Sequence, residues 1–326
     1  MNLAIISPPQ MPCPPAGYGG VERVCDVMVR ELIELGHTVD LYAGPGSTCP
    51  ATNLILSKDS NLINGERELV NLIKPKISSY DCIIDSAACH MTSLMISKKT
   101  VAIMTGDAYV KYPHHEVPNR IYVSREYAEE CGCPKHPYIN NVICKEPAKE
   151  YLLGDGSGGY ALVFSNIGVQ KGVHLAARAS ANAGIGLIVA GPIQDHNYWN
   201  SWCNFPTVKY AGVVNDMKTK LDLLMNAKVM YFMSTCGEGD ALTPKEAMAC
   251  GTPVVATIRN GIRSFLEPYI NGYFASYADE AAEATWLAAA LDRTLVRESA
   301  LEKLDPKPKA KRLAQLCEQV SMGREW

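Results

Sequence analysis

The segment from Val229 to Thr257 reads VMYFMSTCGEGDALTPKEAMACGTPVVAT. The apolar run Val229–Phe232 predicts a buried strand, and a second short apolar run follows at Pro253–Thr257. Between them, Thr243–Cys250 predicts a short helix with Pro244 in its first turn, where the missing N–H costs no hydrogen bond. A strand, a crossover helix and a further strand indicate a parallel α/β sheet.

Short apolar runs alternate with helical segments over almost the whole chain, as expected for parallel strands joined by crossover helices. The clearest helix is Val21–Leu35, whose apolar residues follow a helical period, and Gly36 then supplies the left-handed residue that ends it. The other strands are predicted at Leu3–Ile6, Thr38–Tyr42, Cys82–Ile84, Val101–Met104, Ile121–Val123, Tyr160–Phe164, Gly186–Ala190 and Val208–Tyr210.

The chain length of 326 residues is too great for one ordinary core and fits two domains. The run Gly154–Gly159 has the composition of a flexible linker that does not pack, and a strand is predicted directly after it. We therefore place the boundary near residues 145–158 and predict domains 1–150 and 151–326, each with a doubly wound, Rossmann-like parallel sheet. The segment from Pro306 predicts a last helix, a candidate to cross back to the first domain.

The composition is that of a globular protein, with 47% hydrophobic and 20% charged residues. A formal net charge of -3 provides no field that would attract nucleic acid, and the basic residues at 307–312 fit a solvated helix face. No run reaches the roughly 18 apolar residues that a membrane span needs, and the N-terminal residues predict a strand rather than a signal peptide. We expect a cytoplasmic protein without nucleic-acid partner or integral membrane segment; peripheral membrane contact stays open.

The twelve cysteines are spread along the chain, so we expect reduced thiols that serve as small apolar residues. One group contains residue types that bind zinc: Cys131, Cys133, His136 and Cys144. Its spacing differs from the common C-x2-C pairs, and two prolines interrupt it. We therefore predict no metal site.

The turn after the first strand, AGYGGVE at residues 16–22, is rich in glycine. Glycines let the backbone approach a ligand closely, and the amides at a helix start bind anions such as phosphate. A long turn that merely needs positive φ is the alternative. A nicotinamide dinucleotide fingerprint fits less well, because Glu22 stands at its third glycine position and no acid for the ribose follows the second strand.

Two acids, Glu238 and Glu246, stand on either side of the start of the helix in the opening segment. The amides of Ala241, Leu242 and Thr243 lie between them and are available to an anion. Along the chain, Glu238 would then bind sugar hydroxyls, the amides of residues 241–243 would bind an anion, and Glu246 would bind a ribose diol. An exposed helix residue is the alternative interpretation of Glu246.

Lys171 follows the first strand of the second half, in the sequence FSNIGVQKGV at residues 164–173. A compact cation at this position would neutralise a diphosphate leaving group. Ligands of open α/β sheets bind beyond the carboxyl ends of the strands, and all three motifs lie at such ends. An ordinary surface lysine is the alternative.

These residues resemble the retaining family 4 glycosyltransferases, which have the GT-B fold, two Rossmann-like domains facing a cleft. The resemblance covers most of the chain, and its most specific part is the E-x7-E motif followed by AMACGTPVV. It is carried by four stretches: residues 15–23 through 36–39, 171–173, 190–192 and 238–255.

The resemblance implies roles for the acids and the lysine. Glu246 would accept hydrogen bonds from the donor ribose, Glu238 would contact hydroxyls of the transferred sugar, and Lys171 would bind the diphosphate. The turn glycines and helix-start amides would hold the same diphosphate, and the strand end at 213–214 would contact the nucleobase. The further donor contacts are therefore Gly19, Gly20, Val213, Val214, Ala241, Leu242 and Thr243.

Members of this family retain the anomeric configuration, and the leaving phosphate is thought to help deprotonate the acceptor. This agrees with the absence of an obvious general base. They need no metal, and this chain has no Asp-x-Asp motif. The nucleoside diphosphate sugar is a co-substrate, and no other cofactor is expected.

The chain departs from the family at three positions. Asn166 replaces an arginine, which removes one of two diphosphate cations; a charge-assisted contact is worth about 1.5–3 kcal/mol. Asp240 replaces an aromatic residue and would either recognise a further hydroxyl or mark weakened activity. A histidine near the donor sugar is missing after a central strand, and Asp107 is the candidate substitute, with a solvated turn residue as the alternative.

We predict a hexosyltransferase-type enzyme that moves a sugar from a nucleoside diphosphate to an acceptor bound mainly by the first domain. The acceptor class, a glycan, a lipid or a small molecule, is not indicated. A sugar-nucleotide epimerase of the same fold and a non-catalytic sugar-nucleotide-binding module remain as alternatives. The predicted catalytic residues are Glu238, Lys171 and Asp107, and Asn166, Asp240 and Glu246 join the predicted donor contacts.

Overall fold

The computed structural model describes residues 1–17, 19–96, 99–105 and 116–326. The chain forms two compact units, and the second unit is the continuous segment Glu146–Leu304. The first unit combines Met1–Lys145 with Asp305–Trp326. The segment that follows Leu304 therefore belongs to the first unit, and the break after Lys145 precedes the expected boundary at residue 150.

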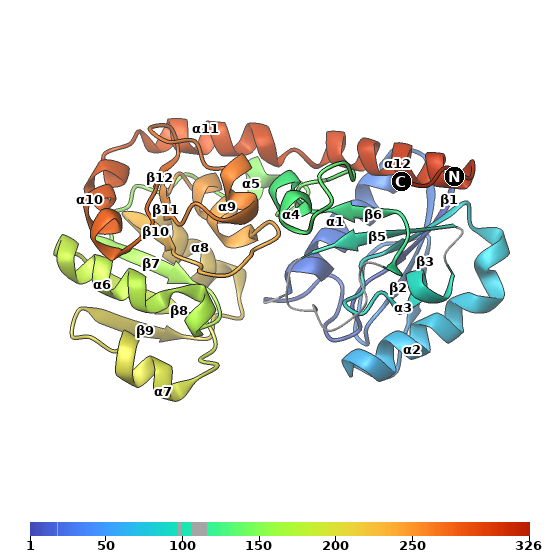
Figure 1. Ribbon diagram of the computed structural model, residues 1–326, viewed down its shortest axis with the longest axis horizontal. Coiled ribbons are helices and arrows are strands. Elements are labelled where there is room, and N and C mark those ends of the chain that lie inside the picture. Colours follow the sequence, from blue (N-terminus) through green and yellow to red (C-terminus); the bar gives the residue numbers. More distant parts are fainter. Residues whose placement is uncertain (18, 97–98, 106–115) are drawn as a thin grey trace. The chain divides into compact units, whose positions relative to one another are not determined.

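The first unit is built on a six-stranded parallel sheet of order β3-β2-β1-β4-β5-β6 (Figure 1). The strands are β1 (Asn2–Ile6), β2 (Thr38–Ala43), β3 (Asn53–Leu56), β4 (Cys82–Asp85), β5 (Thr100–Met104) and β6 (Arg120–Tyr122). The helices are α1 (Gly20–Glu34), α2 (Leu62–Ile73), α3 (Met91–Met95), α4 (Arg125–Glu130) and α12 (Pro306–Ser321), with the 3-10 helix η1 (Lys74–Ser79).

Both faces of this sheet are buried. Strand β1 shows this, because its successive residues point to opposite sides and each side packs in a core cluster. Leu3 and Ile5 lie in one core cluster with residues of α1 and α12, whereas Ala4 and Ile6 lie in another with residues of α2. Helix α12 contacts α1, β4 and β5, so the end of the chain completes the first of these faces.

The second unit repeats the topology with the order β12-β11-β10-β7-β8-β9, again all parallel. Its strands are β7 (Tyr160–Phe164), β8 (Gly186–Ala190), β9 (Val208–Gly212), β10 (Val229–Phe232), β11 (Val254–Ala256) and β12 (Gly272–Phe274). Its helical segments are α5 (Pro147–Glu150), η5 (Val169–Lys171), α6 (Val173–Ala183), α7 (His196–Tyr198), η6 (Trp199–Cys203), α8 (Met217–Asn226), α9 (Leu242–Ala249), η7 (Asn260–Ser264), α10 (Ala278–Ala289) and α11 (Arg293–Leu304).

Helices cover both faces of the second sheet as well. Helices α6 and α10 pack against each other and share a core cluster with strands β7, β8, β10 and β11. Helices α8 and α9 contact β7, β10 and β11, and α11 packs on α9. In both units the first and fourth strands are central neighbours, which is the doubly wound order. The predicted α/β class with two doubly wound parallel sheets is confirmed.

The glycine-rich stretch between the predicted domains is packed, so the prediction of a flexible linker is wrong. The Gly154 amide donates to the Cys250 carbonyl at 2.9 Å, and the Gly156 amide donates to the Met225 carbonyl at 3.0 Å. A Cβ atom on Gly154 would lie 2.2 Å from the Met225 carbonyl oxygen. Glycine here permits close backbone contact rather than flexibility.

The twelve cysteines all lie in the described part of the chain, where none forms a disulfide, and nine of them are buried. Among the described residues, no group of three or more histidine, cysteine or acidic side chains is arranged to hold a metal ion. In the same part of the chain, no helix combines the length and the apolar character needed to span a membrane.

Candidate functional site

The candidate site of the second unit lies where the sheet changes direction. Strands β7 and β10 are neighbours, and the chain winds outward from this pair to both edges. The loops beyond their carboxyl ends therefore diverge, and ligands of doubly wound sheets bind at this switch point. Lys171 follows β7 and Glu238 follows β10, so one residue comes from each side of the switch point.

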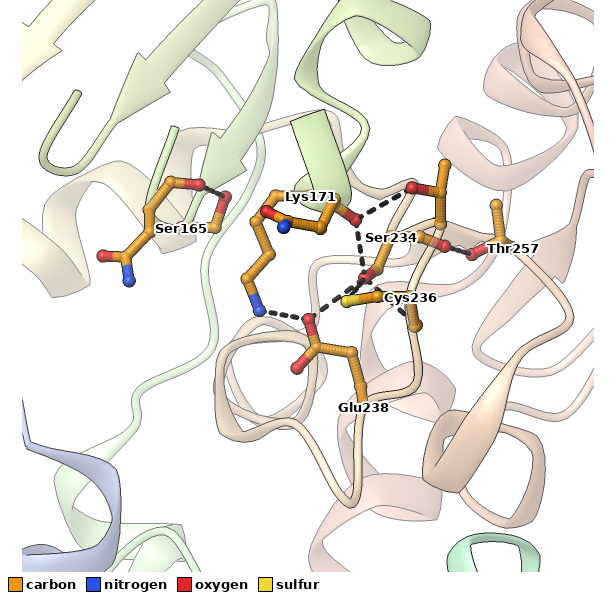
Figure 2. A network of polar contacts seen from close by, with 9 residues as sticks. Ser165, Lys171, Ser234, Cys236, Glu238 and Thr257 are labelled. Atoms are coloured by element: carbon orange, nitrogen blue, oxygen red, sulfur yellow. Dashed lines mark hydrogen bonds and ion pairs between the residues drawn. The ribbon is translucent and has the colours of Figure 1, made fainter. Parts of the chain in front are cut away.

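Figure 2 shows the Lys171 ammonium pointing to the Glu238 carboxylate, and the two form an ion pair. Their side chains are 28% and 17% exposed, so the pair is half-buried but remains accessible. The Ser234 hydroxyl donates to Glu238 Oε1 at 3.1 Å, and the Thr257 hydroxyl donates to the Ser234 carbonyl at 2.6 Å. The loops after β7, β10 and β11 thus meet in one polar network.

Gly172 explains why the lysine is held close to this network. It has a φ of 62°, in the left-handed region, and it forms the N-cap of α6. A Cβ atom at this position would lie 1.9 Å from the Met233 carbonyl oxygen. Only glycine fits such an approach, so the turn that carries Lys171 packs directly on the end of β10.

Glu246 lies in the second turn of α9 and is buried, with its side chain 2% exposed. Lys220 Nζ on α8 lies 2.6 Å from the carboxylate, and the Tyr151 hydroxyl donates to Oε1 at 2.8 Å. Lys220 also lies over the Phe164 ring, 5.5 Å from its centroid. Neither Lys220 nor Tyr151 is among the residues predicted from the sequence; Tyr151 lies next to the stretch that was expected to be a linker.

Asp240 lies in the loop before α9, and its carboxylate is 2.5 Å from Lys245 Nζ. Both side chains are 1% exposed, and Lys245 Nζ is 5.1 Å from the centroid of the Phe265 ring. Burial lowers the pKa of Lys245, and the charge of Asp240 partly raises it again. The contact of Asp240 in this structure is therefore to the helix; recognition of a ligand hydroxyl by Asp240 stays a prediction.

The other predicted donor contacts of the second unit also lie at strand or helix ends. Asn166 follows β7, and Val213 and Val214 follow β9, where Val213 is 50% exposed. Ala241 is the N-cap of α9, and its first turn contains Leu242 and Thr243. The amides of a first turn have no acceptor within their own helix, as an anion site requires.

Three predicted site residues belong to the first unit, whereas the Lys171–Glu238 network belongs to the second. Gly19 is the N-cap of α1 with a φ of 135°, and Gly20 begins that helix. A Cβ atom on Gly19 would lie 2.8 Å from Pro15 Cβ. Asp107 lies outside the described residues, so its prediction has no structural counterpart here.

Residues 160–294 match the family model described as "Glycosyl transferases group 1". The matched segment resembles this family and covers less than half of the chain. It contains β7 to β12 and both sides of the Lys171–Glu238 pair. Assignment to the retaining family 4 stays a prediction.

Solved structures of glycosyltransferases resemble this chain over its whole length. AviGT4, a glycosyltransferase involved in avilamycin A biosynthesis, has a TM-score of 0.79 at 22% identity, with 100% of this chain and 99% of that chain covered. Sucrose-phosphate synthase from Thermosynechococcus elongatus has a TM-score of 0.77 at 16% identity, with 99% and 100% covered. These likenesses confirm the predicted GT-B fold.

HepE from Anabaena, in complex with UDP and glucose, has a TM-score of 0.70 at 15% identity, with 97% of this chain and 98% of that chain covered. No curated protein sequence matches the chain. A comparison of sequences thus relates residues 160–294 to group 1 glycosyltransferases, and a comparison of structures shows the fold of the whole chain.

Proposed function

We propose that this protein is a retaining, metal-independent glycosyltransferase of the hexosyltransferase type, which takes its sugar from a nucleoside diphosphate. The observation that supports this most directly is the Lys171–Glu238 pair at the switch point of the second unit, within the segment that resembles group 1 glycosyltransferases. A cation fits the diphosphate of a sugar nucleotide, and a carboxylate beside it fits the hydroxyls of the attached sugar. The acceptor would be bound mainly by the first unit.

Sugar departure develops negative charge on the diphosphate, and Lys171 would be the cation that stabilises it. The first-turn amides of Leu242 and Thr243 at the start of α9 would add their partial positive charge. Glu238 would then accept hydrogen bonds from sugar hydroxyls instead of pairing with Lys171. Its bond from Ser234 would hold the carboxylate in place during this exchange of partners.

In the proposed reaction, the acceptor oxygen forms a bond to the anomeric carbon while the bond from that carbon to the phosphate oxygen breaks. The acceptor proton passes to the departing phosphate, so no protein base is required. Attack on the face from which the phosphate leaves retains the anomeric configuration. The protein contributes binding, orientation and charge stabilisation.

Substitution of the two acids tests these roles. We expect Glu238→Ala to lower kcat by roughly 10–100-fold, because charge-assisted hydrogen bonds to the reacting sugar are lost. We expect Glu246→Ala to raise the donor KM by a similar factor, because its proposed contact is to the ribose. Glu298→Ala, an exposed acid on α11, is the matched control. Release of the nucleoside diphosphate measures turnover, and unchanged kinetics in both site variants would refute the site assignment.

A uridine diphosphate sugar is the first donor to test, because HepE is seen with UDP and glucose. Incubation of donor alone separates the two alternative functions. An epimerase would convert the donor without an acceptor. A non-catalytic module would bind the nucleotide in calorimetry but neither transfer nor hydrolyse the sugar.

A further inference from the structure

Helix α8 connects two parts of the proposed donor site. It begins directly after the segment that contains Val213 and Val214, the expected nucleobase contact. The Asp216 side chain caps the helix by accepting from the Thr219 amide at 2.8 Å. Lys220 therefore stands in the first turn of a well-anchored helix, between the expected base contact and Glu246.

The Glu246 carboxylate is too buried to be held without a cation. Its side chain is 2% exposed, and an unpaired buried carboxylate either takes up a proton or destabilises the fold. Lys220 supplies this charge, with its Nζ atom 2.6 Å from the carboxylate. Tyr151, which is fully buried, donates a hydrogen bond from its hydroxyl to Glu246 Oε1 at 2.8 Å. The two partners come from different segments of the chain, Lys220 from α8 and Tyr151 from the residue after α5.

Lys220 is also the member of this group nearest to solvent. Its side chain is 15% exposed, whereas those of Glu246 and Tyr151 are almost completely buried. Its ammonium lies over the Phe164 ring at the end of β7, a cation–π contact that limits its movement. A ligand that approaches Glu246 therefore approaches Lys220 as well.

We propose that Lys220 is a positioning residue for ribose recognition: it pairs with the Glu246 carboxylate and keeps it oriented toward the two ribose hydroxyls of the donor. This inference rests on the proposed function and assigns a role to a residue outside the E-x7-E motif. A carboxylate has about four acceptor positions, so it can serve a lysine, a tyrosine and a ligand together. The preference of the protein for a ribonucleotide donor over a deoxyribonucleotide would then depend on Lys220, acting through Glu246.

Calorimetric binding of UDP, GDP, ADP and CDP to the full chain identifies the best nucleotide, and its 2′-deoxy analogue is then the comparison ligand. We expect the wild-type protein to bind the ribonucleotide at least about tenfold more tightly than the analogue, because a hydrogen bond to an ionised acceptor is lost. We expect Lys220→Met to weaken ribonucleotide binding by about tenfold or more and to abolish most of this preference. A merely structural role would not change the ratio of the two affinities.

Lys218→Met is the matched control, because it makes the same change at an exposed position of the same helix. It should retain both the affinity and the preference for ribose. If Lys220→Met behaves like this control, the inference is wrong. If the wild-type protein binds none of the four diphosphates, the proposed function itself fails.

A double variant keeps the test valid if Lys220→Met does not fold. Lys220→Met combined with Glu246→Gln contains no buried charge at this position, so its folding is less affected. We expect it to bind the ribonucleotide as weakly as Glu246→Gln alone, because Lys220 acts through the carboxylate. A further loss of about tenfold in the double variant would show that Lys220 contacts the ligand itself and would overturn the positioning role.

Discussion

Glu66 on α2 is a buried acid outside the proposed donor site. Its two carboxylate oxygens accept from the amides of Cys89 at 2.7 Å and Met91 at 3.4 Å, so it holds the loop that leads into α3. Burial, followed by the nearby charge of Asp85, raises the pKa of Glu66 from its ordinary value of 4.5 to about 7. The residue therefore exchanges a proton near neutral pH.

This raised pKa predicts a pH-dependent stability of the first unit. The unfolded chain releases the Glu66 proton near pH 4.5, whereas the folded chain keeps it up to about pH 7. The contribution to stability is thus complete below pH 4.5 and is lost as the pH rises through 7, on the order of 3 kcal/mol in total. Urea unfolding between pH 5 and 8 should show this slope in the wild-type protein and a smaller slope in Glu66→Gln. Equal slopes would contradict the assignment.

Individual site residues were predictable to different degrees. The proximity of Lys171 and Glu238 could be predicted, because strand ends meet at one edge of a parallel sheet and sequence patterns reveal those strands. Lys220 gave no such signal, since one lysine among the polar residues of α8 is typical of a solvated helix face. Its contact with Glu246 depends on how α8 and α9 pack, which periodicity does not specify.

At the scale of elements, the buried pair of Asp240 and Lys245 fastens the loop after β10 to the first turns of α9. Removing one partner leaves the other charge buried, so we expect Asp240→Ala to lower the free energy of unfolding by about 3–5 kcal/mol. Replacing both residues with apolar ones, as in Asp240→Phe with Lys245→Leu, should recover most of that loss.

Chemical denaturation of the wild-type protein and the two variants measures these differences. A double variant as unstable as Asp240→Ala would mean that the charges themselves, rather than the filling of this buried position, hold the loop. Turnover of the double variant is informative as well, because activity close to wild type would exclude Asp240 as a required donor contact.

Among the strands, those at the centre of each sheet were predicted and two at the edges were not. The missed strands are β3 and β12. Strand β3 is partly exposed along its length, and β12 has three residues and begins with Gly272, so neither gives a long apolar run. Hydrogen bonding to a neighbouring strand defines such edges, and this is tertiary information that a short sequence window lacks.

At the scale of the whole molecule, α12 links the end of the chain to the first unit. Leu316 is 2% exposed in the core cluster that also contains Leu3 and Ile5. We expect Leu316→Ala to destabilise the first unit by about 2–5 kcal/mol, because the truncation leaves a cavity. Gln315→Ala, an exposed neighbour on the same helix, should have little effect. Thermal unfolding, monitored by limited proteolysis of each unit, tests this. Equal stability of the two variants would contradict the packing role of α12.

The return of α12 has a consequence for biosynthesis. On the ribosome, the residues of the first sheet emerge before the second unit, but α12, which helps to cover one face of that sheet, emerges after it. The second unit, by contrast, is complete as soon as Leu304 has left the exit tunnel. The nascent chain must therefore carry part of an apolar sheet face, the part that α12 later covers beside α1, while an entire later unit is translated and folds. During this interval the uncovered part is exposed to aggregation and to chaperones.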